Sequence, residues 1–122
     1  MAKILIIEDN PANMELAVFI LKSAGHTVLS ASDAETGLSL ARGERPTLIL
    51  MDIQLPGIDG LEAIALLKRD DATRAIPVIA LTALAMKGDE ERIRAAGCEG
   101  YIAKPMRYKD VLATIATQLA RL

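Results

Sequence analysis

Cysteine, histidine and aromatic residues are nearly absent from this 122-residue chain. It has one cysteine (Cys98), one histidine (His26) and no tryptophan, and aromatic residues make up 2% of the sequence. A single cysteine excludes a disulfide framework or a zinc cluster within the chain. So few aromatic rings leave no platform on which nucleic-acid bases could stack.

A strong charge of either sign is also missing. The formal net charge is -2, and lysine and arginine gather in no window, so charge does not suggest binding to nucleic acid or an anionic membrane. The apolar run near the N-terminus is too short for a signal peptide, and no later run is long enough to cross a membrane. We therefore expect a cytoplasmic protein that binds neither nucleic acid nor membrane.

The chain does contain enough apolar residues for a core. Hydrophobic residues make up 52% of the sequence and charged residues 25%, which suits one globular domain over residues 1–122. Two domains would need about twice this length. No linker or low-complexity tract interrupts the chain.

Apolar runs rich in β-branched residues alternate with segments of helical period. This pattern predicts about five strands, at Lys3–Glu8, Thr27–Ala31, Thr47–Asp52, Pro77–Thr82 and Gly100–Ala103. Strands that alternate with helices form a parallel sheet with helices on both faces. The expected fold class is α/β, a flavodoxin-like doubly wound (βα)5 arrangement with a five-stranded parallel sheet in the order 2-1-3-4-5.

Signals for helix starts and stops lie between these strands. Asn10 followed by Pro11 is typical of a cap with proline at the first helical position. Ser32–Glu35 and Asp59–Glu62 have the spacing of a capping box, the second with aspartate as the capping residue. Three glycines sit where helices should stop: Gly25, Gly43 and Gly97.

Acidic residues end two of the predicted strands. Glu8 and Asp9 end the first, and Asp52 ends the third. In a flavodoxin-like sheet the strand order reverses between these two strands, and ligands bind at that point. Three converging carboxylates raise one another's pKa unless a cation neutralises them, and oxygen ligands with room for water describe a Mg²⁺ site.

The remaining strands bring a hydroxyl and an ammonium to the same edge. The fourth strand ends in Thr82, and the fifth leads into Lys104 and Pro105. Acids, a metal, a hydroxyl and an ammonium around one pocket indicate a phosphoryl-handling site. No glycine-rich phosphate loop is present, so a nucleotide donor is disfavoured and a carboxylate that itself accepts the phosphoryl group is favoured.

Four motifs now carry a family resemblance. The segments ILIIEDN, LILMDIQLPGIDG, VIALTA and YIAKP, in this order, resemble the motifs of two-component response-regulator receiver domains. The match covers essentially the whole chain. The segment AMKGDEERIRAAGCEGYIAKP is similar both to single-domain members of the family and to receivers attached to hybrid histidine kinases.

The resemblance implies a role for each site residue. Asp52 is the implied phosphoacceptor, Thr82 and Lys104 contact the phosphoryl group, and Thr82 and Tyr101 form the switch. The implied cofactor is Mg²⁺, for which Mn²⁺ could substitute, and its ligands are Glu8, Asp9, Asp52 and the backbone carbonyl of Gln54. A cis peptide between Lys104 and Pro105 is also implied.

The resemblance likewise implies partners. We expect a monomer without an output domain that receives its phosphoryl group from a histidine kinase or a histidine phosphotransfer protein, because His26 is expected at an exposed turn and is no phosphohistidine. A downstream regulatory protein would bind the face of the fourth helix, fifth strand and fifth helix. The only chemistry expected is Mg²⁺-dependent self-phosphorylation and self-dephosphorylation, so the protein is not classed as an enzyme.

Several alternatives stay open at this point. Within the receiver class, one alternative is a relay shuttle that passes the phosphoryl group to a histidine phosphotransfer protein. The other is a receiver cut from a hybrid histidine kinase. A haloacid-dehalogenase-like phosphatase would need an acid in place of Gln54, and a flavodoxin would need a phosphate loop and aromatic rings. Thr82, Lys104 and Tyr101 have ordinary structural readings as a strand threonine, a turn lysine and a core aromatic. Ala83–Met86 either packs under the predicted helix Lys87–Ala96 or repacks on phosphorylation.

Overall fold

Five strands and five helices alternate along the chain. The computed structural model describes residues 2–55, 57, 60–83 and 87–122, with the backbone alone described for 87–90. The strands are β1 Lys3–Ile7, β2 Thr27–Ala31, β3 Leu48–Asp52, β4 Val78–Thr82 and β5 Gly100–Ala103. The helices are α1 Pro11–Ser23, α2 Ala34–Glu44, α3 Gly60–Arg69, α4 Lys87–Ala95 and α5 Tyr108–Ala120. The predicted strands are confirmed to within one residue at each end.

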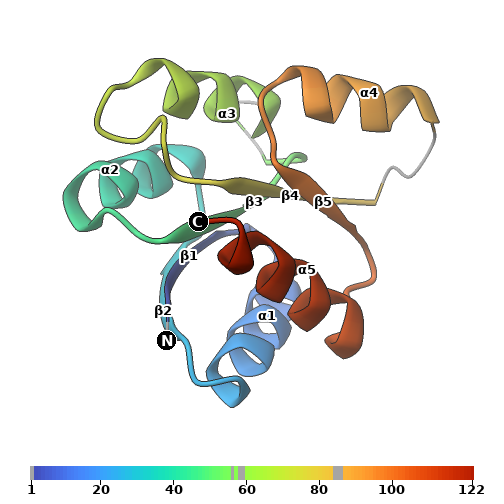
Figure 1. The fold of residues 1–122 in the computed structure, drawn as a ribbon. Helices are drawn as coiled ribbons and strands as arrows, with labels where there is room; N and C mark the ends of the chain where they lie inside the picture. Colours follow the sequence, from blue (N-terminus) through green and yellow to red (C-terminus); the bar gives the residue numbers. More distant parts are fainter. Residues whose placement is uncertain (1, 56, 58–59, 84–86) are drawn as a thin grey trace.

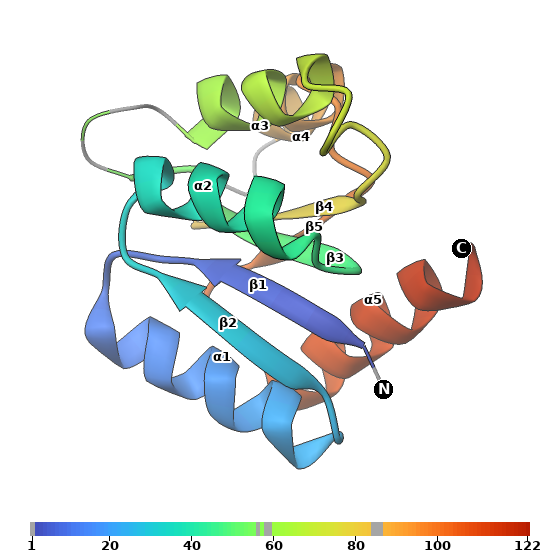
Figure 2. The same ribbon diagram turned by 90° about the vertical axis from the view of Figure 1, so that its left-hand side faces the viewer.

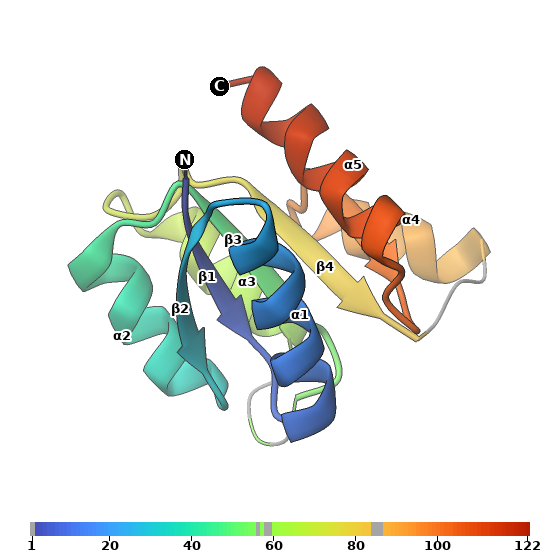
Figure 3. The ribbon, with the colours of Figure 1, turned by 90° about the horizontal axis from the view of Figure 1, so that it is seen from below.

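The strands form one parallel sheet in the order β2-β1-β3-β4-β5, as predicted. Helices α2, α3 and α4 cover one face, and α1 and α5 cover the other (Figures 1 and 2). Figure 3 looks onto the face that α1 and α5 cover. Strand order reverses at β1 and β3, so the carboxyl ends of these two strands open between connections that leave toward opposite faces.

Alternate residues of the central strands build two separate cores. Leu5 and Ile7 of β1 belong to the core under α2, α3 and α4, whereas Ile4 and Ile6 belong to the core over α1 and α5. All five residues of β3 and all five of β4 are buried. Burial on both faces explains why these strands read as continuous apolar runs and not as alternating ones.

Helix termini confirm part of the predicted pattern and correct the rest. The Asn10 side chain caps α1 by accepting a hydrogen bond from the backbone N–H of Asn13 at 3.0 Å. The cap of α2 is Asp33 and not Ser32, and it accepts a hydrogen bond from Thr36 N at 2.7 Å. Gly43 does not end α2 either, because the helix continues to Glu44 and closes at Arg45, whose left-handed φ of 46° precedes a proline.

The predicted helix stops at Gly25 and Gly97 are confirmed, whereas the predicted exposure of His26 is wrong. Gly25 and Gly97 follow their helices with φ of 88° and 107°, as a helix stop requires. His26 is half-buried and not exposed, and its Nδ1 accepts a hydrogen bond from Ala2 N at 3.2 Å. The predicted capping residue Asp59 lies outside the described residues. So do residues 84–86 of the apolar segment Ala83–Met86. Within the described part of the chain, every helix is too short or too polar to traverse a bilayer.

Candidate functional site

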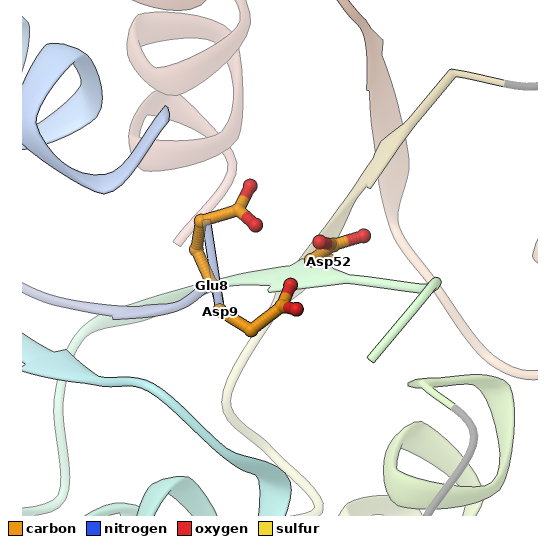
Figure 4. A group of neighbouring side chains, drawn as sticks. All are labelled: Glu8, Asp9 and Asp52. Atoms are coloured by element: carbon orange, nitrogen blue, oxygen red, sulfur yellow. The ribbon is translucent and has the colours of Figure 1, made fainter. Parts of the chain in front are cut away.

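Three carboxylates meet at the carboxyl edge of the sheet. Glu8 and Asp9 directly follow β1, and Asp52 is the last residue of β3. The register pairs Ile7 with Met51, which places the next residues of the two strands side by side. One oxygen from each carboxylate lies within 4.8 Å of the others, and Figure 4 shows the three side chains pointing toward one another. We call these three residues the acidic cluster.

Lys104 supplies the positive charge that faces the acidic cluster. Its Nζ lies 2.8 Å from Glu8 Oε1 and 3.1 Å from Asp52 Oδ2. The Lys104 backbone N–H donates a hydrogen bond to Thr82 O at 2.7 Å, so the start of the loop after β5 is tied to β4. The Lys104–Pro105 peptide is cis, as the family resemblance implied. One ammonium therefore contacts two of the three carboxylates.

Glu8 is the most deeply buried acid of the cluster. Its side chain is 0% exposed. Burial and the neighbouring Asp52 carboxylate raise the pKa of Glu8 from 4.5 to about 7, against the opposing effect of Lys104 and of the Asn10 backbone N–H. Among the described residues Glu8 Oε1 receives no well-directed hydrogen bond, although Lys104 Nζ is close enough for an ion pair.

Asp52 titrates in the opposite direction. Burial by itself would raise its pKa, but hydrogen bonding with Glu8, the Gln54 backbone N–H and Lys104 outweighs burial, so the pKa of Asp52 is lowered. The Gln54 N–H donates to Asp52 Oδ1 at 2.9 Å. For Lys104, burial would lower the pKa, but Glu8 and Asp52 together raise it. Its hydrogen-bond partners therefore favour the ionised form of the Asp52 carboxylate.

The donor set fits a divalent cation. Carboxylate oxygens are the ligands that hard cations prefer, and three of them converge here. The raised pKa of Glu8 and its poorly satisfied Oε1 both indicate negative charge in excess of what Lys104 neutralises. The acidic cluster is therefore able to bind a metal ion.

The predicted switch residues lie on the two strands beyond β3, Thr82 on β4 and Tyr101 on β5. Thr82 is fully buried at the end of β4. Tyr101 of β5 is half-buried and packs against the core under α2, α3 and α4. It also borders a cavity of about 320 Å³, which is lined in part by Asp110 and Thr114 of α5. The Tyr101 ring is therefore neither fully core nor free in solvent. Gln54 is exposed and contacts Asp52 through its backbone N–H.

Sequence reasoning missed the backbone groups that hold the acids. Asn10 N donates to Glu8 Oε2 at 3.2 Å, so the residue that caps α1 also orients an acid of the cluster. The Gln54 N–H plays the same role for Asp52. Both donors lie two residues after the acid that they hold. This turn geometry is common for aspartate and gives no signal of its own in the sequence.

The family follows from a sequence match that covers most of the chain. The sequence profile of the response regulator receiver domain matches residues 4–116, so the chain belongs to this family. Its members are regulators in two-component signalling that interact with histidine kinases and downstream regulators, and they are not classical enzymes.

One relative is similar to this chain over nearly its whole length. The chain is 50% identical over 116 residues to the polar-differentiation response regulator DivK of Brucella anthropi, an alignment that covers 95% of this chain and 94% of DivK. DivK is a single-domain response regulator.

Solved structures agree with this assignment. A response regulator from Chloroflexus aurantiacus superposes with a TM-score of 0.93 at 27% identity, covering 98% of both chains. The receiver domain of a sensor histidine kinase from Pseudomonas aeruginosa superposes with a TM-score of 0.88 at 34% identity, covering 95% of both chains. That second structure is described with a magnesium ion coordinated in its active-site cleft.

Proposed function

We propose that this protein is a phosphorelay receiver in which Asp52 accepts a phosphoryl group from a phosphohistidine of a histidine kinase. The observation that carries the proposal is the placement of Asp52. It ends a fully buried strand, keeps a lowered pKa, and faces both Lys104 and two further acids. A rigid strand end holds a nucleophile in position better than a loop does.

The proposed transfer is a displacement at phosphorus. An Asp52 carboxylate oxygen forms the new P–O bond while the P–N bond of the phosphohistidine breaks, and the electron pair of that bond stays on the imidazole nitrogen. The Gln54 N–H keeps the Asp52 carboxylate oriented for this attack. Lys104, which already lies 3.1 Å from Asp52 Oδ2, would pair with the phosphoryl oxygens as charge gathers on them.

We propose Mg²⁺ as the metal of the acidic cluster, with Mn²⁺ able to replace it. Glu8, Asp9, Asp52 and the backbone carbonyl of Gln54 would hold it. When bound, the ion neutralises the negative charge of the acids and of the phosphoryl group. The fit rests on the three converging carboxylates and on the buried Glu8 oxygen that lacks a well-directed hydrogen bond.

The proposed output is a changed surface at α4, β5 and α5. The Lys104 backbone is bonded to Thr82 O, so a Lys104 that moves toward the phosphoryl group acts directly on the end of β4 and on the loop after β5. Tyr101 lies on β5 and lines a cavity next to α5. Coupling of this kind is typically worth about 1–3 kcal/mol, which is a roughly 5–150-fold change in partner affinity.

Phosphorylation by a small donor tests the proposal without any partner. The protein is incubated with acetyl phosphate and Mg²⁺, and its intact mass is measured. We expect one phosphate-sized adduct that is absent in Asp52→Asn and in EDTA. Asparagine keeps the shape of Asp52 and removes the nucleophile, so circular dichroism of this variant should match the wild type. An adduct that persists in Asp52→Asn would refute the assignment of the acceptor.

The relay alternative differs only in the next step. A shuttle would pass the phosphoryl group from Asp52 to a histidine of a phosphotransfer protein, and the same acidic cluster and Lys104 would serve that reverse transfer. Loss of the adduct on adding a phosphotransfer protein, with gain of the same mass by that protein, would favour the shuttle.

A further inference from the structure

Gly60 lies directly against the backbone that carries Asp52. It is the first residue of α3 and is buried. A Cβ built on Gly60 would overlap the Cα of Ile53, and it would lie 2.5 Å from Asp52 O and 2.8 Å from Ile53 C. Real Cβ atoms essentially never come so close to other heavy atoms. All three neighbours are backbone atoms, which cannot swing aside as the end of a side chain can.

We infer that Gly60 is a positioning residue for the phosphoacceptor, an inference that rests on the proposed role of Asp52. Having no side chain, Gly60 allows the first turn of α3 to press on the Asp52–Ile53 backbone from one side. In addition, Ile53 N donates a hydrogen bond to Leu81 O of β4 at 3.2 Å. The backbone at the end of β3 is therefore in contact with both α3 and β4.

The direction of the Asp52 carboxylate depends on this short piece of backbone. The Gln54 N–H that orients Asp52 Oδ1 follows immediately, and the proposed metal ligand is the carbonyl of the same residue. The Asp52 side chain is only 3% exposed, so it has little space in which to recover its position by rotation. Displacing a reacting group by about 1 Å can cost on the order of 100-fold in rate.

Two other helical glycines provide matched controls. At Gly37 of α2 an added Cβ would meet the buried Ile7 side chain, with Cγ1 at 2.6 Å and Cγ2 at 3.3 Å, so this variant controls for crowding of side chains in the core. At Gly43, also in α2, it would meet nothing within 4 Å. At Gly43, inside α2, alanine also favours the helix over glycine. Only at Gly60 does the new methyl group push against the backbone of the site.

The test compares Gly60→Ala, Gly37→Ala and Gly43→Ala in the full chain. The rate of phosphorylation by acetyl phosphate is measured at saturating Mg²⁺, at a temperature well below the unfolding midpoint of each variant, together with amide ¹H–¹⁵N spectra. We expect Gly60→Ala to lose about 10- to 100-fold in rate, with amide shifts at Asp52–Gln54. The two controls should keep the wild-type rate. A purely structural role would lower the midpoint and leave the rate of the folded protein unchanged.

The outcomes separate this inference from the proposed function. If the wild type forms no adduct on Asp52, the proposed function fails. If the wild type is phosphorylated and folded Gly60→Ala reacts at the same rate, only the role of Gly60 is overturned. Should Gly60→Ala be too unstable, Gly43→Ala is added to the same chain to favour α2. A double variant that still does not fold would overturn the inference, because Gly60 would then be required by the fold and not by the acceptor.

Discussion

Lysine and carboxylate side chains form a cluster at each end of the sheet, and the two clusters differ in how well their charges match. At the carboxyl end, Lys104 faces the three acids of the acidic cluster. At the amino end, where β4 and β5 begin, Lys68 pairs with the single carboxylate of Glu99 at 3.0 Å. Both lysines are mostly buried, with 15% and 18% of their side chains exposed.

At the amino end, Lys68 Nζ and both oxygens of the Glu99 carboxylate have hydrogen-bond partners. Lys68 Nζ also donates to Ile76 O at 2.9 Å, and Glu99 Oε1 accepts the Val78 N–H at 2.7 Å. Helix α3 and the starts of β4 and β5 are joined through these groups. At the carboxyl end, by contrast, Glu8 has a raised pKa and an oxygen without a well-directed hydrogen bond. The same residue types stabilise the fold where charges balance, and form a site able to bind a metal ion where they do not.

Exchanging the two lysines for neutral residues should have the largest effect, and only at one end. We expect Lys104→Ala to bind Mg²⁺ and to lose nearly all of the response to the phosphoryl mimic beryllofluoride. The ammonium that would pull the loop after β5 toward the site is then missing. The response is measured as amide shifts at Tyr101–Tyr108 and 91–96 in ¹H–¹⁵N spectra. Lys68→Met is the control and should respond as the wild type does.

A wild-type response in Lys104→Ala would break the comparison, since both lysines would then be merely structural. Shifts confined to the neighbourhood of Asp52 in the wild type itself would instead place the output surface elsewhere than on α4, β5 and α5.

Loss of stability should follow the opposite pattern. We expect Lys68→Met to lower the free energy of unfolding by about 1–3 kcal/mol, because the carbonyl of the buried Ile76 and the partly exposed Glu99 carboxylate lose their charged donor. Methionine keeps most of the apolar stem, so lost packing contributes little. Urea unfolding followed by circular dichroism measures the change, and acetyl phosphate should still phosphorylate the variant at the wild-type rate. A coincident loss of phosphorylation would show that the two ends are coupled.

The net pH dependence of stability should be the smallest effect, because the pKa shift of Glu8, worth at most about 3 kcal/mol, is opposed by the pKa shift of His26. In EDTA, folded Glu8 keeps a proton that the unfolded chain releases between pH 4.5 and about 7, so stability is lost as pH rises through this window. Asp52 has a lowered pKa, so its contribution is lost only as pH falls below 3.8. His26, whose pKa burial lowers from 6.5, acts in the opposite direction to Glu8.

Glu8→Gln isolates the Glu8 contribution because it leaves His26 unchanged. Urea unfolding of both proteins at several pH values should give a steeper fall in the wild type than in the variant. Parallel curves would mean that Glu8 is ionised throughout and that the charges at the carboxyl end are better matched than its surroundings indicate.

Much of the carboxyl end could be predicted from the sequence because it depends on topology. Apolar runs with short connections define parallel strands, and acids placed directly after two of them must meet if those strands are neighbours. The positions of Glu8, Asp9 and Asp52 follow from that reasoning, and the structure brings them together. Lys104 follows in the same way from the strand that precedes it. Their roles in phosphoryl transfer remain proposals.

The amino end was not predicted, since its contacts have no local pattern. Lys68 and Glu99 are 31 residues apart, and nothing in either neighbourhood marks the pair. Gly60 reads locally as an ordinary residue at a helix start, and only the approach of α3 to β3 gives its missing side chain a purpose. Local errors had local causes: Asp33 replaced Ser32 as the cap, and Arg45 before a proline replaced Gly43 as the helix stop.

The sequence by itself determined which residues form strands, where helices lie between them and which acids stand at the strand ends. It could do so because periodicity, capping residues and strand-end position are properties of short segments. The tertiary structure alone decided how charge is balanced at the two ends and how closely α3 approaches Asp52. The pKa of a carboxyl group and the room beside a backbone depend on distances of a few ångströms between segments far apart in the chain. Only packing sets those distances.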